Sequence, residues 1–244
     1  MKVVILAGGY ATRLHPITID EPKPLLKVAH KPIVEHITDK LQGLEVVDEI
    51  FVVTNQKFFV HFLEWSNSYK SQKKIKIIND LTTNNEDRLG SIGDINFVMT
   101  QENLNDDLLI IGGDNLFEDD LQEFLQHFIQ HGSTILVNDV HSFEKAKLFG
   151  IVTRDENNVI TDFIEKPESP SSTLSATLIY AIKKEHLSYI QGTIKNGLSD
   201  RAGDFIKYLS QNKPVSALTL NGRWFDIGTI EMLDEANEVY QNEN

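Results

Sequence analysis

The sequence predicts an α/β protein in which helices flank both faces of a mixed, mostly parallel sheet. Apolar runs of strand length alternate with helical patterns for most of the chain, which is typical of strands joined by helical crossovers. Two glycines follow the first apolar run, as expected where a buried strand ends at a ligand-binding turn. The 244 residues, 41% of them hydrophobic, can build one large core, and no linker divides them. We therefore predict a single Rossmann-like domain over residues 1–244.

The first part of the chain provides most of the expected sheet. In the predicted helix at 57–69, Phe58, Phe62 and Trp65 recur at i, i+4 and i+7, which indicates a core-facing stripe rather than a platform for stacking bases. Strands are expected at 3–7, 49–54, 75–78, 108–112 and 134–140, and helices near 33–41, 57–69, 92–100 and 121–130.

The pattern changes after Gly150 to shorter strands. The second part of the chain is expected to extend the same sheet and to form the far wall of a cleft. Strands are expected at 151–154, 159–165, 177–181 and 215–220, with a hairpin turn at 156–158, and helices near 202–211 and 230–240.

Composition narrows the classes of partner. The formal net charge of -13 argues against nucleic acid, because a phosphate backbone is held mainly by clustered Lys and Arg. The absence of cysteine excludes disulfides and thiolate metal sites and favours the cytoplasm. The first apolar run is too short for a signal-peptide core, and no later run is long enough to span a bilayer. We expect a cytoplasmic protein without nucleic-acid or membrane partners, and leave a homo-oligomer open.

The connection after the first strand predicts a nucleotide site. Gly8 and Gly9 let the backbone approach a ligand, and amide N–H groups there can face an anion. Arg13 adds a rigid fork of donors and Lys23 a compact charge, a combination suited to a polyphosphate. Neither G-x-G-x-x-G nor G-x-x-x-x-G-K-[ST] is present, so the two common nucleotide fingerprints do not apply.

This connection resembles the signature of the sugar-1-phosphate nucleotidylyltransferases, L-A-G-G-x-G-T-R-L-x-P-x-T followed by P-K-P-L. One position departs from it: Ala11 stands where the family has glycine, so a methyl group lies where the loop approaches the phosphates. A small residue is tolerable there if its φ is negative. The matching positions are Leu6, Ala7, Gly8, Gly9, Thr12, Arg13, Leu14, Pro16, Thr18, Pro22, Lys23, Pro24 and Leu25.

Three later segments resemble the same family, in the same order. Residues 110–115 resemble a strand-ending G-D-N whose Asp114 binds magnesium. Residues 149–152 with 165–167 resemble the Y-G-V and E-K-P pair that holds the sugar and its phosphate. Residues 222–229 resemble the G-x-W-x-D-I-G-T segment with a second metal-associated aspartate, Asp226. Taken alone, Asp114 is better explained as a turn former and Glu165-Lys166 as a solvated ion pair, and Asp226 could be a helix cap. Four motifs in order favour the functional interpretation.

The resemblance implies a short enzyme similar to glucose-1-phosphate thymidylyltransferase, with a GT-A-type sheet and no acyltransferase domain. A sugar 1-phosphate oxygen would attack the α-phosphorus of a nucleoside triphosphate (NTP), giving an NDP-sugar and pyrophosphate. A phosphate monoester has a second pKa of about 6, so alignment and charge neutralisation, not proton removal, should carry catalysis. Mg²⁺ held by Asp114 and Asp226 would share that task.

The resemblance also implies roles for residues. Residues 1–140 would form the nucleotide-binding half of the domain and residues 141–244 the sugar-phosphate half. The implied catalytic residues are Arg13, Lys23 and Asp114. The implied sugar-phosphate ligands are Glu165 for a hydroxyl, Lys166 for the phosphate, and Gly150, which would leave room for the ring. The implied nucleotide-binding residues are Leu6, Ala7, Gly8, Gly9, Thr12, Arg13 and Gly90.

Several alternatives stay open at this point. The base-reading segment lacks the family's Gln-Pro element before a G-T-A or G-L-A run, and only Gly90 is carried over from it. Chain size favours dTTP or UTP, whereas GTP or CTP with another phosphorylated acceptor is the alternative. A non-catalytic NDP-sugar-binding homologue that regulates a partner is a second alternative, disfavoured by the intact Arg13 and Lys23. A glycosyltransferase of similar architecture is a third, disfavoured because Asp114 begins no D-x-D motif.

Overall fold

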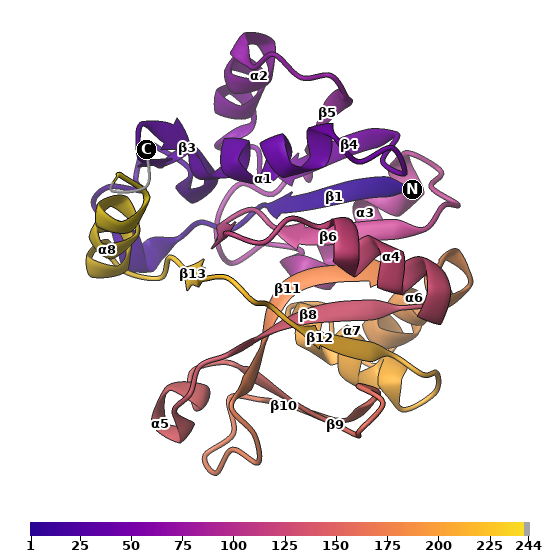
Figure 1. The fold of residues 1–244 in the computed structure, drawn as a ribbon. Coiled ribbons are helices and arrows are strands. Elements are labelled where there is room, and N and C mark those ends of the chain that lie inside the picture. The colour runs from indigo at the N-terminus through magenta and orange to yellow at the C-terminus, as the bar shows by residue number, and fades with distance from the viewer. Residues whose placement is uncertain (242–244) are drawn as a thin grey trace.

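The computed structural model describes residues 1–241, so the last three residues of the expected domain, 242–244, lie outside the described residues. Within this range one nine-stranded mixed sheet runs through the molecule, with helices on both faces, as expected for a single α/β domain (Figure 1). Its strands are β1 (Lys2–Ala7), β4 (Glu49–Thr54), β5 (Lys74–Asn79), β6 (Leu108–Gly112), β8 (Thr134–Asp139), β9 (Gly150–Arg154), β10 (Ile160–Glu165), β11 (Leu174–Ile182) and β12 (Ser216–Thr219).

The parallel part of the sheet is built by the first part of the chain. Its strands lie side by side in the order β5-β4-β1-β6, and each neighbouring pair is parallel. Parallel strands end at the same edge of a sheet, so the loops that follow β5, β1 and β6 emerge together. This edge is where ligands bind in open α/β sheets.

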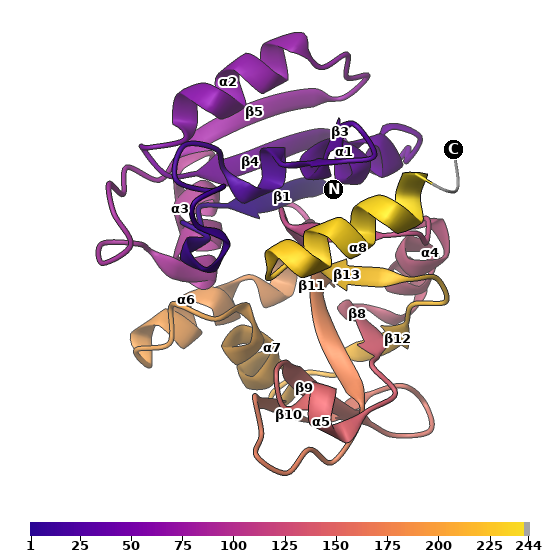
Figure 2. The same ribbon diagram turned by 90° about the vertical axis from the view of Figure 1, so that its left-hand side faces the viewer.

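Strand β11 joins the two parts of the chain. Its last residues pair antiparallel with β6 on one side and with β8 on the other, and its first residues pair with β8 and β9 (Figure 2). A bulge between Ala176 and Tyr180 separates these stretches, and Leu178 within it has a φ of 58°. The expected strand at 177–181 is therefore longer, beginning at Leu174. The predicted hairpin turn at 156–158 is confirmed between β9 and β10.

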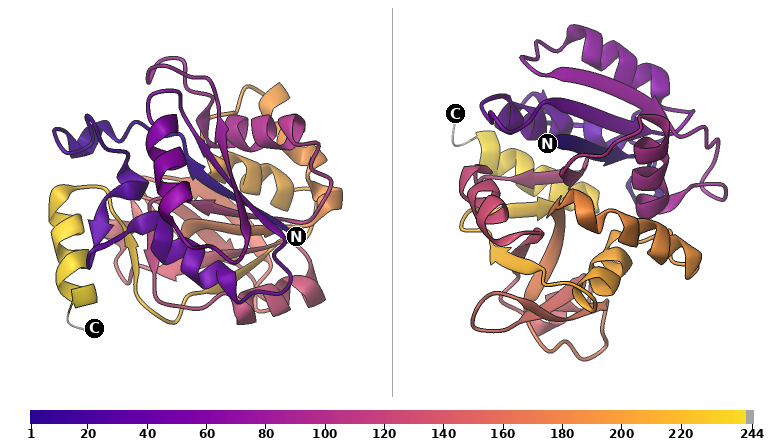
Figure 3. Two further views of the ribbon diagram at one scale, coloured as in Figure 1. Left: turned by 90° about the horizontal axis from the view of Figure 1, so that it is seen from above. Right: turned by 90° about the vertical axis from the view of Figure 1, so that its right-hand side faces the viewer.

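The helices cover the two faces of the sheet in two layers (Figure 3). Side chains of β1 alternate between the faces: Val3 and Ile5 pack under one layer, and Val4 under the other. The aromatic stripe of Phe58, Phe62 and Trp65 is buried, as predicted. The first layer consists of α1 (Ile33–Gln42), α2 (Phe59–Ser68) and α4 (Gln122–His131), and the second of α3 (Gly90–Gln101), α6 (Ser188–Lys195) and α7 (Ala202–Ser210).

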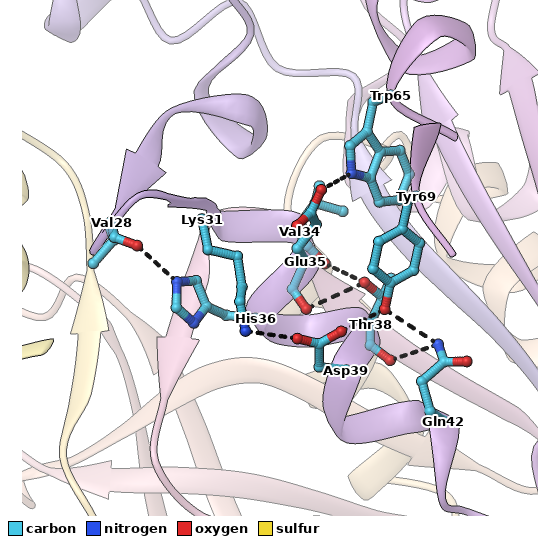
Figure 4. Close-up of polar contacts among 10 residues, drawn as sticks. All are labelled: Val28, Lys31, Val34, Glu35, His36, Thr38, Asp39, Gln42, Trp65 and Tyr69. Carbon is cyan, nitrogen blue, oxygen red and sulfur yellow. Dashed lines mark hydrogen bonds and ion pairs between the residues drawn. The ribbon is translucent and has the colours of Figure 1, made fainter. Parts of the chain in front are cut away.

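A polar network joins α1 to its neighbours (Figure 4). Asp39 pairs with Lys31 at 2.7 Å and accepts a hydrogen bond from the Tyr69 hydroxyl at 2.5 Å. The Trp65 indole N–H donates to Glu35 at 2.9 Å. These contacts fix α1 against both α2 and the strand that precedes it, next to the turn formed by Lys23–Leu25.

Several short elements were not predicted. They include the hairpin of β2 (Lys27–Val28) and β3 (Lys31–Pro32), whose turn residues Ala29 and His30 both have positive φ without being glycine. A second small sheet pairs β7 (Asn115–Phe117) with β13 (Trp224–Asp226). Helix α5 (Phe143–Ala146) and α6 were also missed, whereas α8 (Ile230–Gln241) was expected. Among the described residues no helix combines the length and apolar character needed to cross a bilayer.

Candidate functional site

Two adjoining cavities open at the edge where the parallel strands end. The β1 cavity lies beside the loop after β1, and the β9 cavity lies beside β9. Arg13 and Asp114 line both. Of the implied site residues only Thr12 lines neither cavity within residues 1–241. The β1 cavity also collects Leu6, Ala7, Gly8, Gly9, Lys23 and Gly90, and the β9 cavity collects Gly150, Glu165, Lys166 and Asp226.

Lys23 is the centre of charge where the cavities meet. Its ammonium lies 2.6 Å from Asp114 Oδ2 and 3.9 Å from Asp226 Oδ1, and the residue is only 7% exposed. Burial works to raise the pKa of Asp114, but the Lys23 ammonium outweighs it and holds that pKa below its usual value. Burial and the neighbouring Asp114 together raise the pKa of Asp226. A further cation at this point would relieve the repulsion between the two carboxylates.

The small sheet of β7 and β13 brings these carboxylates together. Asp226 lies opposite Asn115, the residue after Asp114. The Trp224 indole N–H donates to Asn115 Oδ1 at 2.6 Å, and the Asn115 amide donates to the Gly112 carbonyl at 3.2 Å. Two segments more than a hundred residues apart are thereby fixed beside one another. Paired carboxylate oxygens fit Mg²⁺, which needs few protein ligands when phosphate oxygens complete its shell.

The loop after β1 presents Arg13 to both cavities. Arg13 is exposed and is the middle residue of the turn Thr12–Leu14. Ala11 has φ 46° and ψ 42°, a left-handed conformation, so the expectation that alanine is tolerated through a negative φ is wrong. This conformation costs an L-residue roughly 1–2 kcal/mol. The Ala11 carbonyl accepts hydrogen bonds from Leu14 N at 3.0 Å and Thr18 Oγ1 at 2.8 Å, which hold the strained loop in place.

A pair of buried carboxyl groups that the sequence analysis missed lies behind Gly8. A Cβ on Gly8 would stand 2.7 Å from Asp94 Oδ2 and 3.1 Å from Asp80 Oδ2, so only glycine fits. Burial, together with the Asp80 carboxylate, raises the pKa of Asp94 to about 8. Asp94 therefore carries a proton at neutral pH and donates it to Asp80, which also accepts from Thr82 N at 2.7 Å. No motif links these acids, since they lie on different elements.

Replacing Asp94 with asparagine should remove a pH dependence of stability. The pKa of Asp94 is higher in the folded chain than its ordinary 3.8, so the folded state binds the extra proton between these values and this contribution declines as pH rises. Asp94→Asn keeps a donor for Asp80 and cannot titrate. Its free energy of unfolding relative to the original protein should therefore rise by up to about 1.4 kcal/mol per pH unit between pH 5 and 8.

Urea unfolding at pH 5, 6, 7, 8 and 9 measures this difference. Glu86→Gln, an exposed acid-to-amide change near the same loop, is the matched control and should show no such trend. A difference between Asp94→Asn and the original protein that stays constant with pH would contradict the shared proton.

Two glycines frame the β9 cavity. A Cβ on Gly150 would lie 2.7 Å from Phe163 Cζ, and one on Gly203 would lie 2.6 Å from the same ring. A Cβ on Gly150 would also lie 3.0 Å from Glu165 Oε2, so a side chain there would press on both Phe163 and Glu165; the expected role of Gly150, leaving room for a sugar ring, stays a prediction. Lys166 has φ 46°, and its amide donates to the Phe149 carbonyl at 2.9 Å. The glycines position Glu165 at the cavity wall.

Gly203→Ala should destabilise the protein by about 1–3 kcal/mol and weaken acceptor binding. Alanine normally favours a helix over glycine, but the buried Phe163 ring cannot yield to the new methyl group. Thermal unfolding and the acceptor KM measure both effects. Gly43→Ala is the control, because Gly43 has φ -82° and nothing lies within 4 Å of its Cβ position. Equal stability of the two variants would show that Phe163 yields to the methyl group.

Gly90 lies close to another segment of the chain as well as lining the β1 cavity. Its φ is +79°, and a Cβ there would lie 2.4 Å from Asp200 Cα. Sequence analysis transferred Gly90 as a close-approach site for base or sugar, and the structure gives it this second role. Arg201 was not identified from the sequence. It follows Asp200 and lines the β9 cavity together with Lys166.

Comparison with known proteins places this geometry in context. The family model described as nucleotidyl transferase matches residues 2–243. The "Bifunctional protein GlmU" of Methanocaldococcus jannaschii is 34% identical over 98% of this chain and 54% of its own length. A Sulfolobus acidocaldarius protein assigned as a mannose-1-phosphate guanyltransferase is 32% identical over 93% of this chain and 60% of its own. The chain thus spans little more than half the length of these relatives.

A solved structure adds a match in three dimensions. A Bacillus anthracis protein assigned as a glucose-1-phosphate thymidylyltransferase, in complex with sucrose, has a TM-score of 0.83 and 26% identity. The match covers 100% of this chain and 96% of that one. The names of these proteins differ in the base that is transferred, so similarity alone does not choose the nucleotide.

Proposed function

Because the chain belongs to the nucleotidyl transferase family, we propose that it transfers a nucleoside monophosphate from an NTP to a sugar 1-phosphate and releases pyrophosphate. One observation carries the proposal: Lys23, Asp114 and Asp226 lie where two cavities meet, and Arg13 reaches both. The β1 cavity would hold the NTP and the β9 cavity the acceptor. The halves 1–140 and 141–244 supply most of each cavity, although several residues cross this division.

The site residues have separate tasks in this proposal. Arg13 stabilises the charge that develops on the α-phosphate and on the departing pyrophosphate. Lys23 grips the triphosphate, and Lys166 with Arg201 holds the acceptor phosphate. No residue needs to remove a proton, because the attacking phosphate oxygen is already ionised near neutral pH. Alignment of two polyanions, with their repulsion neutralised, is the protein's contribution.

We propose that Asp114 and Asp226 hold Mg²⁺. When bound, the ion neutralises phosphate charge and orients the phosphate oxygens. The two carboxylates fit the ion because their oxygens are hard ligands and because Asp114 and Asp226 both lie close to the Lys23 ammonium, where the cavities meet. Removing divalent ions with EDTA should abolish pyrophosphate release, and added Mg²⁺ should restore it. Full turnover in EDTA would contradict the magnesium role.

A matrix of NTPs against phosphorylated acceptors, scored by pyrophosphate release with Mg²⁺, tests the proposed function. The choice of dTTP or UTP stays a prediction from chain size, and GTP, CTP and non-sugar acceptors belong in the same matrix. Nucleotide binding without pyrophosphate release from any pair would favour the non-catalytic homologue. Sugar transfer from an NDP-sugar without pyrophosphate would favour a glycosyltransferase. The expected cytoplasmic location rests on composition alone.

A further inference from the structure

An ion pair on the wall of the β1 cavity connects this cavity to the proposed acceptor side. Arg88 lies in the loop between β5 and α3, and Asp200 lies in the connection between α6 and α7. The guanidinium donates through Nε to Asp200 Oδ1 at 3.1 Å and through Nη2 to Oδ2 at 3.0 Å, a two-pronged contact. Both residues line the β1 cavity, and Asp200 also lines the β9 cavity. The pair therefore touches both proposed substrate sites.

Backbone hydrogen bonds join the two segments that carry this ion pair. The first amides of α3 donate to the connection: Ser91 N bonds to the Asp200 carbonyl at 2.8 Å, and Ile92 N bonds to the Ser199 carbonyl at 3.0 Å. These bonds satisfy helix N–H groups that would otherwise lack partners. Gly90 permits the contact, since its missing Cβ leaves room for Asp200 Cα. Segment 199–203 thus rests on the end of α3, and Arg88 closes the contact from the side.

Segment 199–203 carries two residues of the acceptor side. Arg201 lines the β9 cavity, and Gly203 packs on Phe163 beside Glu165. On one side the segment is held by α7, where Asp204 N donates to the Arg201 carbonyl at 3.0 Å. On the other side it is held by the first amides of α3 and by Arg88. The backbone that carries Arg201 therefore contacts a residue that belongs to the proposed nucleotide side.

We propose that Arg88 is a positioning residue for the acceptor: through Asp200 it holds segment 199–203, and with it Arg201, against the β9 cavity. The proposal rests on the proposed function for its substrate assignment. Loss of Arg88 leaves the contacts of Lys23 with Asp114 and Asp226 intact, and it makes segment 199–203 more mobile. Because the pair is exposed but two-pronged, we expect the acceptor KM to rise about three- to tenfold, with the NTP KM within about twofold.

The first test measures the holding role without any substrate. Hydrogen exchange is followed at the amides of residues 91–93 and in segment 199–203, in the original protein, in Arg88→Met and in Lys76→Met. The control breaks a comparable exposed ion pair, Lys76 with Glu102, outside the cavities. We expect faster exchange at both places in Arg88→Met only. Unchanged exchange in that variant would overturn the proposal.

The second test measures the two KM values, with the acceptor that supports the highest wild-type turnover in the substrate matrix. Asp200→Asn should raise the acceptor KM as Arg88→Met does, and the double variant should be no worse than either, because both remove one contact. A rise in the NTP KM alone would assign Arg88 to nucleotide binding and overturn the proposal. An acceptor KM in the double variant that rises by the product of the two single-variant effects would overturn the proposal too. Absence of wild-type turnover counts against the proposed function, and the exchange result then decides the holding role by itself.

Discussion

Replacing Lys23 with methionine should lower turnover by roughly a hundred- to a thousandfold, the loss typical of removing one preorganised charge-stabilising donor. The ammonium is held 2.6 Å from Asp114 and 3.9 Å from Asp226, so methionine leaves two carboxylates facing each other and the incoming phosphates. The pKa of Asp114 then rises toward its usual range, because the cation that lowers it is gone. Pyrophosphate release under saturating Mg²⁺ measures the loss.

Stability should respond much less than turnover in Lys23→Met. Asp114 and Asp226 are surrounded by protein atoms that desolvate them, but their side chains keep 41% and 39% of their surface open to the cavities, so water screens part of the charge that loses its partner. Methionine also refills the space of the buried lysine stem. Thermal unfolding should therefore show a folded protein, with exposed Lys27→Met as the matched control. Turnover within tenfold of the original protein would contradict the role given to Lys23.

Arg13→Ala should lower turnover by on the order of a hundredfold or more, with little change in unfolding temperature. Arg13 is exposed in both cavities, so its removal uncovers no core, while the charge it supplies to the reacting phosphates disappears. Arg13→Lys should recover part of the loss, because the charge returns without the two-pronged geometry. Single-turnover rates with the best NTP separate this effect from binding. Near-normal turnover in Arg13→Ala would contradict the assignment.

The strands and helices with a clear period were predictable from sequence, and so were the motifs. The run before Gly8 could only be a buried strand, and the loop residues Arg13 and Lys23 lie close together in the chain. Nearly all the site residues that the motifs implied line one of the two cavities in the structure.

What sequence reasoning missed depends on contacts between distant segments. Strands β7 and β13 have three residues each and are stable only because they pair across a hundred residues. Helix α6 contains Gly192 and Thr193, which weaken its helical pattern. Asp80 and Asp94 form a pair only after α3 packs beside β1. Arg201 and Gly203 carry no motif of their own, and only their position on the cavity wall identifies them.

Strand β11 has a consequence for any attempt to divide this protein. It enters the sheet between β6 and β8, so the strands of residues 1–140 are joined into one sheet by a strand from later in the chain. A fragment ending at residue 140 would leave β6 with an unpaired edge and would be prone to associate with other chains. Residues 1–140 and the part of the chain that follows them should therefore fold in one cooperative step.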